Sequence, residues 1–395
     1  MKHGWELLPL GEVVSLDRQQ AMHMGLPYVG LEDIEGHTGR FVGPIGPRTV
    51  QSTTFRFTRE HVLYGRLRPY LNKVLAPDFE GHCSTEIIPL VPAHSVVRAY
   101  LFYWLSSPAT VHLLNATATG ARMPRANLDQ ALALEVPVPS VSEQRRIVAI
   151  LDEAFEGIAT AKAHAERNLQ NAREVFASRM QASLDRNEGW ERVQLAELLA
   201  RQWITSHLDG NHGSDYPRKE EFVSEGVPYI AASAIRNGTV DFAEAKYLSR
   251  QRAASIRKGL AKDRDVLFAH NATVGPVAIL STTEDVVILG TSLTYYRCDP
   301  RFVHPEYLAH FMVSPAFTSQ YLQVMKQSTR NQVPITKQRE FFHIIPPIDV
   351  QRRIADELGE LSERVTRLAD IQASKLAALD ELKQSLLHQA FSGAL

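Results

Sequence analysis

Basic and aromatic side chains are interleaved in one short stretch of the first half of the chain. Residues 56–73 contain a single acid, Glu60, among five cations and three aromatic rings. Guanidinium groups neutralise phosphates and can form a fork on guanine, so this mixture suits DNA. The predicted DNA contacts in this stretch are Tyr64, Arg66, Arg68, Tyr70 and Lys73.

Amide and basic side chains recur at matching places in the second half. Arg122 and Arg125 lie on a loop of the first half. The second half has Arg330, Asn331, Gln332 and Lys337 on the corresponding loop, and His270 and Asn271 just after a Val-Leu strand. Asn and Gln pair with adenine, and losing a base-reading residue such as Arg122 or Asn331 is expected to cost about 1–3 kcal/mol at one base. Any one arginine is more often a solvated surface charge, and only the recurrence in both halves favours DNA contact.

The sequence lacks the common catalytic and phosphate-binding motifs. No Gly is followed by Lys, as a P-loop requires, and the histidines form neither HxxxH nor HExxH nor a zinc pattern with cysteine. Asp78 and Glu86 are a short step apart, but no lysine completes a metal-nuclease triad, so we interpret both as ordinary loop and strand residues. We predict a chain with no catalytic residue, metal site or cofactor of its own.

Composition is typical of a globular chain long enough for two domains. The 395 residues are 44% hydrophobic and 22% charged. Because the net charge is -1, basic groups must be sorted onto one surface if the chain binds nucleic acid. Cys83 and Cys298 form no CxxC pair and are expected to be reduced thiols. No apolar signal core opens the sequence, and the uncharged stretch 99–121 is interrupted by polar residues and proline. We predict a cytoplasmic protein outside the membrane.

The segments that must position these residues occur twice in the sequence as an internal repeat. Gln-Arg-Arg-Ile at 144–147 recurs at 351–354, and a proline lies five residues before each glutamine. The stretches 142–184 and 350–391 around these motifs read as long helices. Upstream, Val62-Leu63 matches Val266-Leu267 at an offset of 204, and residues 100–109 match 307–316 at an offset of 207. The same order of elements in both halves predicts one duplicated fold.

Each long helix carries a narrow apolar stripe on an otherwise charged surface. The stripe has the 4-3 spacing of a coiled coil, which favours another such helix as its partner over a globular core. The predicted helix-helix seam consists of Ile147, Leu151, Ile158, Ile354, Leu358, Leu361, Val365 and Leu368. We predict an antiparallel coiled coil with pseudo-two-fold symmetry. Two unrelated amphipathic helices, each packed on its own domain, are the alternative.

The repeat divides the chain into four parts. Short β-branched and aromatic runs followed by helical spacing predict α+β domains at 1–139 and 187–347. The long helices occupy 140–186 and 348–395. Helical spacing within the domains is expected to begin near Arg98 and Pro305.

These motifs, taken together, resemble the specificity subunit of type I restriction-modification systems. The resemblance covers nearly the whole chain, and its best marks are 141–147, 350–354 and the ending 387–393. Val350 departs from the family pattern, which usually has Glu there, as this chain does at Glu143. The departure concerns only the start of the helix.

The resemblance implies a non-catalytic subunit with two target recognition domains, each reading one half of a split, asymmetric sequence in double-stranded DNA. It also implies two methyltransferase subunits as partners and, through them, restriction and translocase subunits. S-adenosylmethionine, ATP and magnesium are expected only on those partners. A helix of about 42 residues is about 63 Å long, enough to separate two half-sites by a helical turn of DNA or somewhat more. A coiled-coil scaffold that binds no DNA is the alternative function, and a self-contained methyltransferase or nuclease lacks the motifs it would need.

Overall fold

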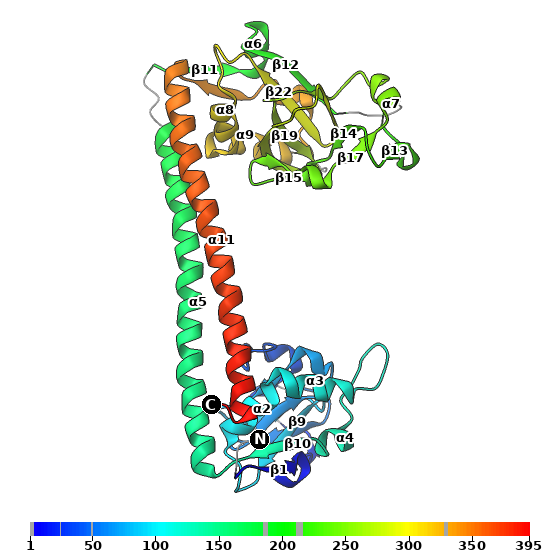
Figure 1. Cartoon of the computed structure of the whole chain (residues 1–395), viewed down its shortest axis with the longest axis vertical. Helices are drawn as coiled ribbons and strands as arrows, with labels where there is room; N and C mark the ends of the chain where they lie inside the picture. Colours follow the sequence, from blue (N-terminus) through cyan, green and yellow to red (C-terminus); the bar gives the residue numbers. More distant parts are fainter. Residues whose placement is uncertain (1–3, 24, 49, 185–188, 211–215, 328–330) are drawn as a thin grey trace. The chain divides into compact units, whose positions relative to one another are not determined.

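A computed structural model of the chain describes residues 4–23, 25–48, 50–184, 189–210, 216–327 and 331–395. The chain forms two compact units, the first made of residues 1–166 and 372–395 and the second of residues 167–371. Each unit combines a lobe of strands and short helices with part of each of two long helices (Figure 1). We call the elements β1 to β10 the first lobe and the elements β11 to β23 the second lobe.

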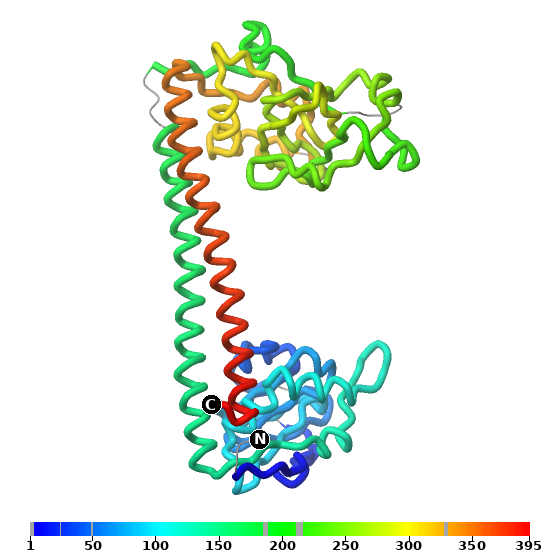
Figure 2. Tube along the Cα trace, viewed as in Figure 1, coloured from blue at the N-terminus to red at the C-terminus, as the bar shows by residue number. Residues whose placement is uncertain are grey.

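The two long helices are continuous. Helix α5 runs over Val141–Leu184 and helix α11 over Ile348–Ser392, as the tube in Figure 2 traces. In the first unit, Lys162 of α5 forms an ion pair with Asp380 of α11, and Nη2 of Arg146 donates to the backbone oxygen of Leu395 at 2.8 Å. Residue numbers rise along one helix as they fall along the other, so the pairing here is antiparallel. In the second unit, Arg179 of α5 forms an ion pair with Glu357 of α11.

The first lobe consists of two four-stranded sheets, a two-stranded ribbon and short helices. Its strands are β1 (Glu6–Pro9), β2 (Val14–Leu16), β3 (Gln20–Ala21), β4 (Tyr28–Val29), β5 (Thr54–Phe57), β6 (Val62–Gly65), β7 (Val74–Leu75), β8 (Gly81–Cys83), β9 (Ile87–Pro92) and β10 (Glu135–Val138). Its α-helices are α1 (Leu10–Val13), α2 (Arg98–Ser106), α3 (Pro108–Ala116) and α4 (Leu128–Leu132), and its 3₁₀ turns are η1 (Leu31–Asp33) and η2 (Pro69–Leu71). The sheets have the strand orders β2-β9-β6-β7 and β3-β5-β8-β4, and β1 pairs with β10.

The second lobe repeats this plan with additional strands. Its strands are β11 (Glu191–Gln194), β12 (Ile204–Asp209), β13 (Phe222–Val223), β14 (Val227–Ile230), β15 (Ile235–Arg236), β16 (Thr239–Val240), β17 (Lys246–Leu248), β18 (Leu260–Ala261), β19 (Val266–Asn271), β20 (Thr273–Ile279), β21 (Val287–Leu289), β22 (Leu293–Cys298) and β23 (Phe342–Ile345). Its helices are α6 (Leu195–Ala200), α7 (Arg250–Ala254), α8 (Pro305–Val313), α9 (Pro315–Lys326) and α10 (Ile335–Gln338), with 3₁₀ turns η4 (Lys219–Glu221), η5 (Ala232–Ala234) and η6 (Phe242–Glu244). The main sheets have the orders β12-β22-β19-β20 and β13-β17-β14-β21-β18.

The two lobes share one topology. The order β2-β9-β6-β7 corresponds to β12-β22-β19-β20, and both second sheets contain one parallel pair, β4 with β8 and β14 with β21. The ribbon β1–β10 places Glu6 opposite Val138, and β11–β23 places the equivalent Glu191 opposite Ile345. The predicted duplication and the α+β fold class, with two similar lobes and two long helices, are therefore confirmed. The pseudo-two-fold symmetry and the four-part domain bounds stay predictions.

Helices α2 and α8 begin where the spacing predicts them, at Arg98 and Pro305. The short helices α1, α6 and α7 lie earlier in the lobes, and the spacing did not predict them. Ser107 and Pro108 then start α3: the Ser107 side chain accepts a hydrogen bond from the backbone N–H of Thr110, and proline suits a first helical position. Ser314 and Pro315 occupy the equivalent corner at the start of α9. Both lobes thus begin the second of two consecutive helices at a Ser-Pro pair, although only the Ser107 side chain caps its helix.

Each lobe buries its own core and takes in residues of the long helices. In the first unit, Ile147 and Leu151 of α5 and Leu387 and Ala390 of α11 are buried in the core of the lobe. In the second unit, the core takes in Met180 and Leu184 of α5 and Ile354, Ala355 and Leu358 of α11. No described helix combines the length and apolar character that crossing a membrane would need.

Candidate nucleic-acid interface

In the first lobe, the segment after β6 pairs with a loop from a distant part of the sequence. The backbone N–H of Arg68 donates to the carbonyl of Pro124 at 2.7 Å, and that of Ala126 donates to the carbonyl of Arg66 at 2.9 Å. Between these bonds, Leu67 and Arg125 form an antiparallel bridge. We call this pairing of 66–68 with 124–126 the first cross-loop ladder. It brings together two segments that the sequence marked separately as basic.

The second lobe contains the same ladder. The N–H of Ala272 donates to the carbonyl of Asn331 at 3.0 Å, the N–H of Val333 donates to the carbonyl of His270 at 2.8 Å, and Asn271 bridges Gln332. These residues lie 204 and 207 positions after their counterparts, the offsets of the repeat. Even the left-handed backbone recurs, at Arg68 (φ 53°) and Ala272 (φ 62°). Residues 270–272 and 331–333 form the second cross-loop ladder.

The carboxylate of Glu86 pairs with two arginines of the first ladder. Glu86 lies 2.7 Å from Nη2 of Arg125 and 3.2 Å from Nε of Arg66. The Arg125 hydrogen bonds, together with the positive charge of both guanidinium groups, hold the pKa of Glu86 below its usual value. The cluster carries one net positive charge at neutral pH, which favours an anionic partner. The sequence interpretation of Glu86 as an ordinary strand residue missed this contact, because no pattern in the sequence places Glu86 beside Arg66 and Arg125.

The remaining first-lobe predictions divide between surface and core. Arg68 and Arg122 are exposed, and Tyr70 is 47% exposed. Tyr64 is buried in the core of the lobe, where burial raises the pKa of its hydroxyl. Lys73 is half-buried, and its Nζ donates to the carbonyls of Leu31 and Ile34 at 2.5 and 2.8 Å. The prediction of DNA contact is corrected for Tyr64 because its ring is buried. For Lys73, whose half-buried ammonium ties two parts of the lobe together, DNA contact stays a prediction.

Second-lobe predictions divide in the same way. Asn271 and Gln332 are half-buried at the ladder, and Asn331 is exposed, although its side-chain amide donates to the carbonyl of Ala272. Lys337 is exposed and pairs with Glu340 at 3.0 Å. His270 is 1% exposed, and its Nδ1 lies 3.0 Å from the carbonyl of Val333, so it supports the ladder from inside and the expectation of DNA contact is corrected. Arg330 lies outside the described residues.

The predicted seam residues are buried to different degrees. Ile147, Leu151, Ile158, Ile354 and Leu358 are buried, whereas Leu361, Val365 and Leu368 are half-buried. Residues at the start of each helix therefore pack both in the stripe and in a lobe core, and the spacing alone did not distinguish these two roles. Ile147 and Leu151, like Ile354 and Leu358, also enter the core of the adjacent lobe. These positions are buried because the first turns of each helix pack against the lobe that precedes the helix in the sequence.

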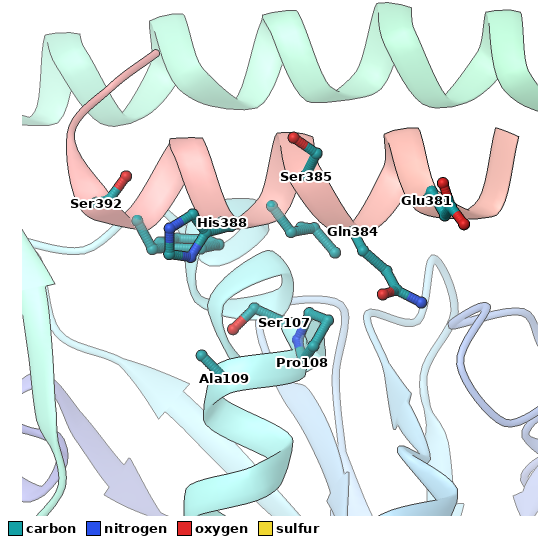
Figure 3. Close-up of a pocket in the computed structure, with 10 residues that line it drawn as sticks. Ser107, Pro108, Ala109, Glu381, Gln384, Ser385, His388 and Ser392 are labelled. Atoms are coloured by element: carbon teal, nitrogen blue, oxygen red, sulfur yellow. The ribbon is translucent and has the colours of Figure 1, made fainter. Parts of the chain in front are cut away.

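A pocket among the described residues of the first unit lies elsewhere. It has a volume of about 570 Å³ and is found where the α2–α3 corner faces the end of α11. Figure 3 shows Ser107 and Pro108 on one side and Gln384 and His388 on the other. None of its lining residues is a predicted DNA contact. In each lobe, the candidate interface is therefore the surface around its own ladder. The described residues also contain no group of three His, Cys, Asp or Glu side chains placed to hold a metal ion.

Two lobes of one topology, each with a cross-loop ladder and each leading into a long helix, define a duplicated fold. Residues 53–168 match the family model of the type I restriction modification DNA specificity domain. These residues contain the first-lobe sheet strands from β5 onward, the ladder and the start of α5. The resemblance found in the sequence is thereby confirmed.

Similar proteins carry the same description. The chain is 20% identical over 311 residues to the type I restriction enzyme EcoBI specificity subunit of Escherichia coli, covering 74% of this chain and 65% of that protein. It is 20% identical over 314 residues to the EcoKI specificity subunit of E. coli strain K12, covering 78% and 67%. The match to the EcoBI subunit thus spans a little less than two thirds of that relative's length.

Solved structures share the fold over the whole chain. One comes from work on complex assembly and conformational transition of the type I R-M system, with a TM-score of 0.82, 21% identity and coverage of 100% of this chain and 99% of that one. Another is the HsdS subunit of Thermoanaerobacter tengcongensis, with a TM-score of 0.62, 21% identity and coverage of 100% and 98%. At this identity the likeness concerns the fold.

Proposed function

We propose that this chain is the DNA-recognition subunit of a type I restriction-modification complex. Each lobe reads one half of a split target in double-stranded DNA, and the chain catalyses no reaction itself. Methyltransferase subunits, two of them, dock on it, and restriction subunits join through them. S-adenosylmethionine, ATP and magnesium belong to those partners, and the complex acts in the cytoplasm of a prokaryotic cell.

The observation that supports this most strongly is the cross-loop ladder, built twice with one backbone and different side chains. Residues related by the repeat offsets of 204 and 207 make the same backbone hydrogen bonds in both ladders, while their side chains differ in charge and shape. A shared frame with variable polar side chains suits the reading of two unlike base sequences. The proposed target is therefore asymmetric.

The test is methylome sequencing of a host that lacks its own restriction systems and expresses this chain with its methyltransferase subunits. We expect one methylated motif made of two unlike half-sites separated by unspecified bases. Methyltransferase subunits expressed without the chain should leave that motif unmodified. An unchanged methylation pattern with and without the chain, or a continuous symmetric motif, would contradict the proposal.

Two matched arginine variants connect the motif to the proposed surface. Arg122→Ala removes an exposed arginine beside the first ladder, and Arg301→Ala removes one of the second lobe that pairs with Asp299 at 2.5 Å. Because losing a base or phosphate contact weakens binding, we expect Arg122→Ala to lower methylation in vivo and Arg301→Ala to leave it unchanged. Equal effects of the two variants would argue against the ladder as the interface.

A further inference from the structure

Three equivalent positions around the ladders carry different chemistry in the two lobes. The repeat aligns Arg66 with His270 and Arg125 with Gln332. The backbone aligns Glu86 with Ser292, because the N–H of Arg66 donates to the carbonyl of Glu86 at 2.9 Å and the N–H of His270 donates to that of Ser292 at 2.9 Å. Charged groups occupy all three positions in the first lobe, whereas two neutral polar side chains and a buried histidine occupy them in the second. The frame is shared, and the side chains it presents are not.

The hydrogen bonds of Arg125 leave two of its guanidinium donors unused. Nε and Nη2 both donate to the Glu86 carboxylate, at 2.9 and 2.7 Å, and Nη1 donates to the carbonyl of Met123 at 3.3 Å. A guanidinium group has five N–H donors, so two remain, one on each terminal nitrogen. Neither has an acceptor among the described residues. A guanidinium group with two free donors can form a fork on O6 and N7 of guanine in the major groove.

The equivalent Gln332 offers a different pattern. Its backbone is bridged to Asn271, and its side chain is half-buried with no hydrogen-bond partner among the described residues. A primary amide presents one donor and one acceptor side by side, which match N7 and the N6 amino group of adenine. The buried His270 ring supports this position, because its Nδ1 lies 3.0 Å from the carbonyl of Val333, the residue after Gln332.

We propose that Arg125 and Gln332 are the equivalent base-reading residues of the two lobes. Arg125 reads a guanine in the half-site of the first lobe, and Gln332 reads an adenine in the half-site of the second. Glu86 is a positioning residue that fixes the plane of the Arg125 guanidinium group. This inference rests on the proposed function, since it names the base chemistry of the same surface.

The test is selection of duplexes from a randomised library by the full chain in complex with its methyltransferase subunits. The wild-type complex should select a split motif with an invariant guanine in one half-site and an adenine in the other. Arg125→Gln should replace the guanine preference by adenine at that one position and leave the other half-site unchanged. Arg125→Lys keeps the charge and loses the fork, so discrimination at that position should fall about 5- to 150-fold while affinity for unrelated DNA is kept.

Glu86→Gln separates positioning from a merely structural role. It frees two arginines from their carboxylate, so affinity for unrelated DNA should rise while discrimination at the guanine falls. A structural role would lower both. Arg301→Gln is the matched control, because Arg301 forms the same Nε and Nη2 fork with Asp299, and both half-sites should survive it.

The outcomes distinguish this inference from the function on which it rests. A wild-type complex that selects no motif overturns both. A wild-type split motif that Arg125→Gln leaves intact, or weakens equally at every position, overturns only the assignment of Arg125. Gln332→Ala should abolish the adenine preference in the half-site of the second lobe. If it instead abolished a preference in the half-site of the first lobe, the equivalence of Arg125 and Gln332 would be wrong. Thermal unfolding of each variant confirms that it is folded at the selection temperature.

Discussion

At the scale of the residue, the candidate interface contains side chains proposed to contact DNA and others that are buried in the lobe core. Tyr64 and Arg66 are two positions apart in one aromatic and basic stretch, yet Tyr64 is 5% exposed while Arg66 is half-buried and belongs to the first cross-loop ladder. The Tyr64 hydroxyl is buried without a hydrogen-bond partner among the described residues. Its hydroxyl loses the hydrogen bonds that it makes to water in the unfolded chain and forms no replacement, which costs free energy.

Tyr64→Phe should therefore leave DNA selection unchanged and should not lower stability. Removing an unsatisfied buried hydroxyl is expected to change the free energy of unfolding by between zero and about +1 kcal/mol, measured by urea denaturation. The control is Tyr100→Phe, whose hydroxyl donates to the carbonyl of Pro137 at 2.8 Å and whose loss should cost about 1 kcal/mol. A Tyr64→Phe variant with altered base preference would return Tyr64 to the interface.

The sequence predicted the location of the interface better than its members. Recurrence in two halves marked 64–73 with 122–125 and 270–271 with 331–332, and the ladders join both pairs of segments. It could not predict that His270 is buried or that the Lys73 ammonium donates to two carbonyls of its own lobe, because both depend on segments distant in sequence. Glu86 was missed for the same reason: it is 39 residues from Arg125 in sequence, and only the folded sheet brings them together.

At the scale of the element, a buried glutamine fixes the start of each long helix. The Gln144 amide donates to the carbonyls of Ser95 and Pro139 at 2.8 and 2.9 Å and accepts from the N–H of Val97 at 2.7 Å. Gln351 makes the three equivalent contacts, with Phe302, Pro346 and His304, each at 2.8 Å. Gln-Arg-Arg-Ile could be found in the sequence as a repeat, but nothing in the pattern indicated that its glutamine is completely buried.

Gln144→Ala should destabilise the first unit substantially. It leaves three backbone groups without their partner, each expensive to bury unpaired, so we expect a loss of about 2–4 kcal/mol in the free energy of unfolding. Gln170→Ala is the matched control on the same helix, because exposed Gln170 bonds only to Glu174 among the described residues, at 2.7 Å, and should lose less than about 0.5 kcal/mol. Comparable losses from the two variants would show that the buried contacts do not anchor the helix.

At the scale of the whole molecule, the second unit contains two buried histidines whose pKa is lowered strongly. The second unit buries His207 and His343, and burial lowers the pKa of each ring to about 4. A hydrogen bond to the Gln338 side chain offsets this effect only in part for His207, as does one to the carbonyl of Phe341 for His343. At the position equivalent to His343, the first lobe has Val136, a buried apolar residue that cannot titrate.

Because of these two histidines, the second unit should be the more acid-sensitive. In the unfolded chain each ring titrates near its ordinary pKa of about 6.5, so below that pH the unfolded state binds protons that the folded state excludes. Stability is therefore complete above about pH 6.5 and falls as the pH approaches 4, by on the order of 2 kcal/mol per histidine at pH 5. Hydrogen exchange of the full chain between pH 7 and pH 5 should show protection falling more in 189–371 than in 4–166. In the double variant His207→Gln, His343→Gln this difference in pH dependence should largely disappear, whatever its effect on stability at pH 7. An equal loss of protection in both units of the wild-type chain would contradict the assignment.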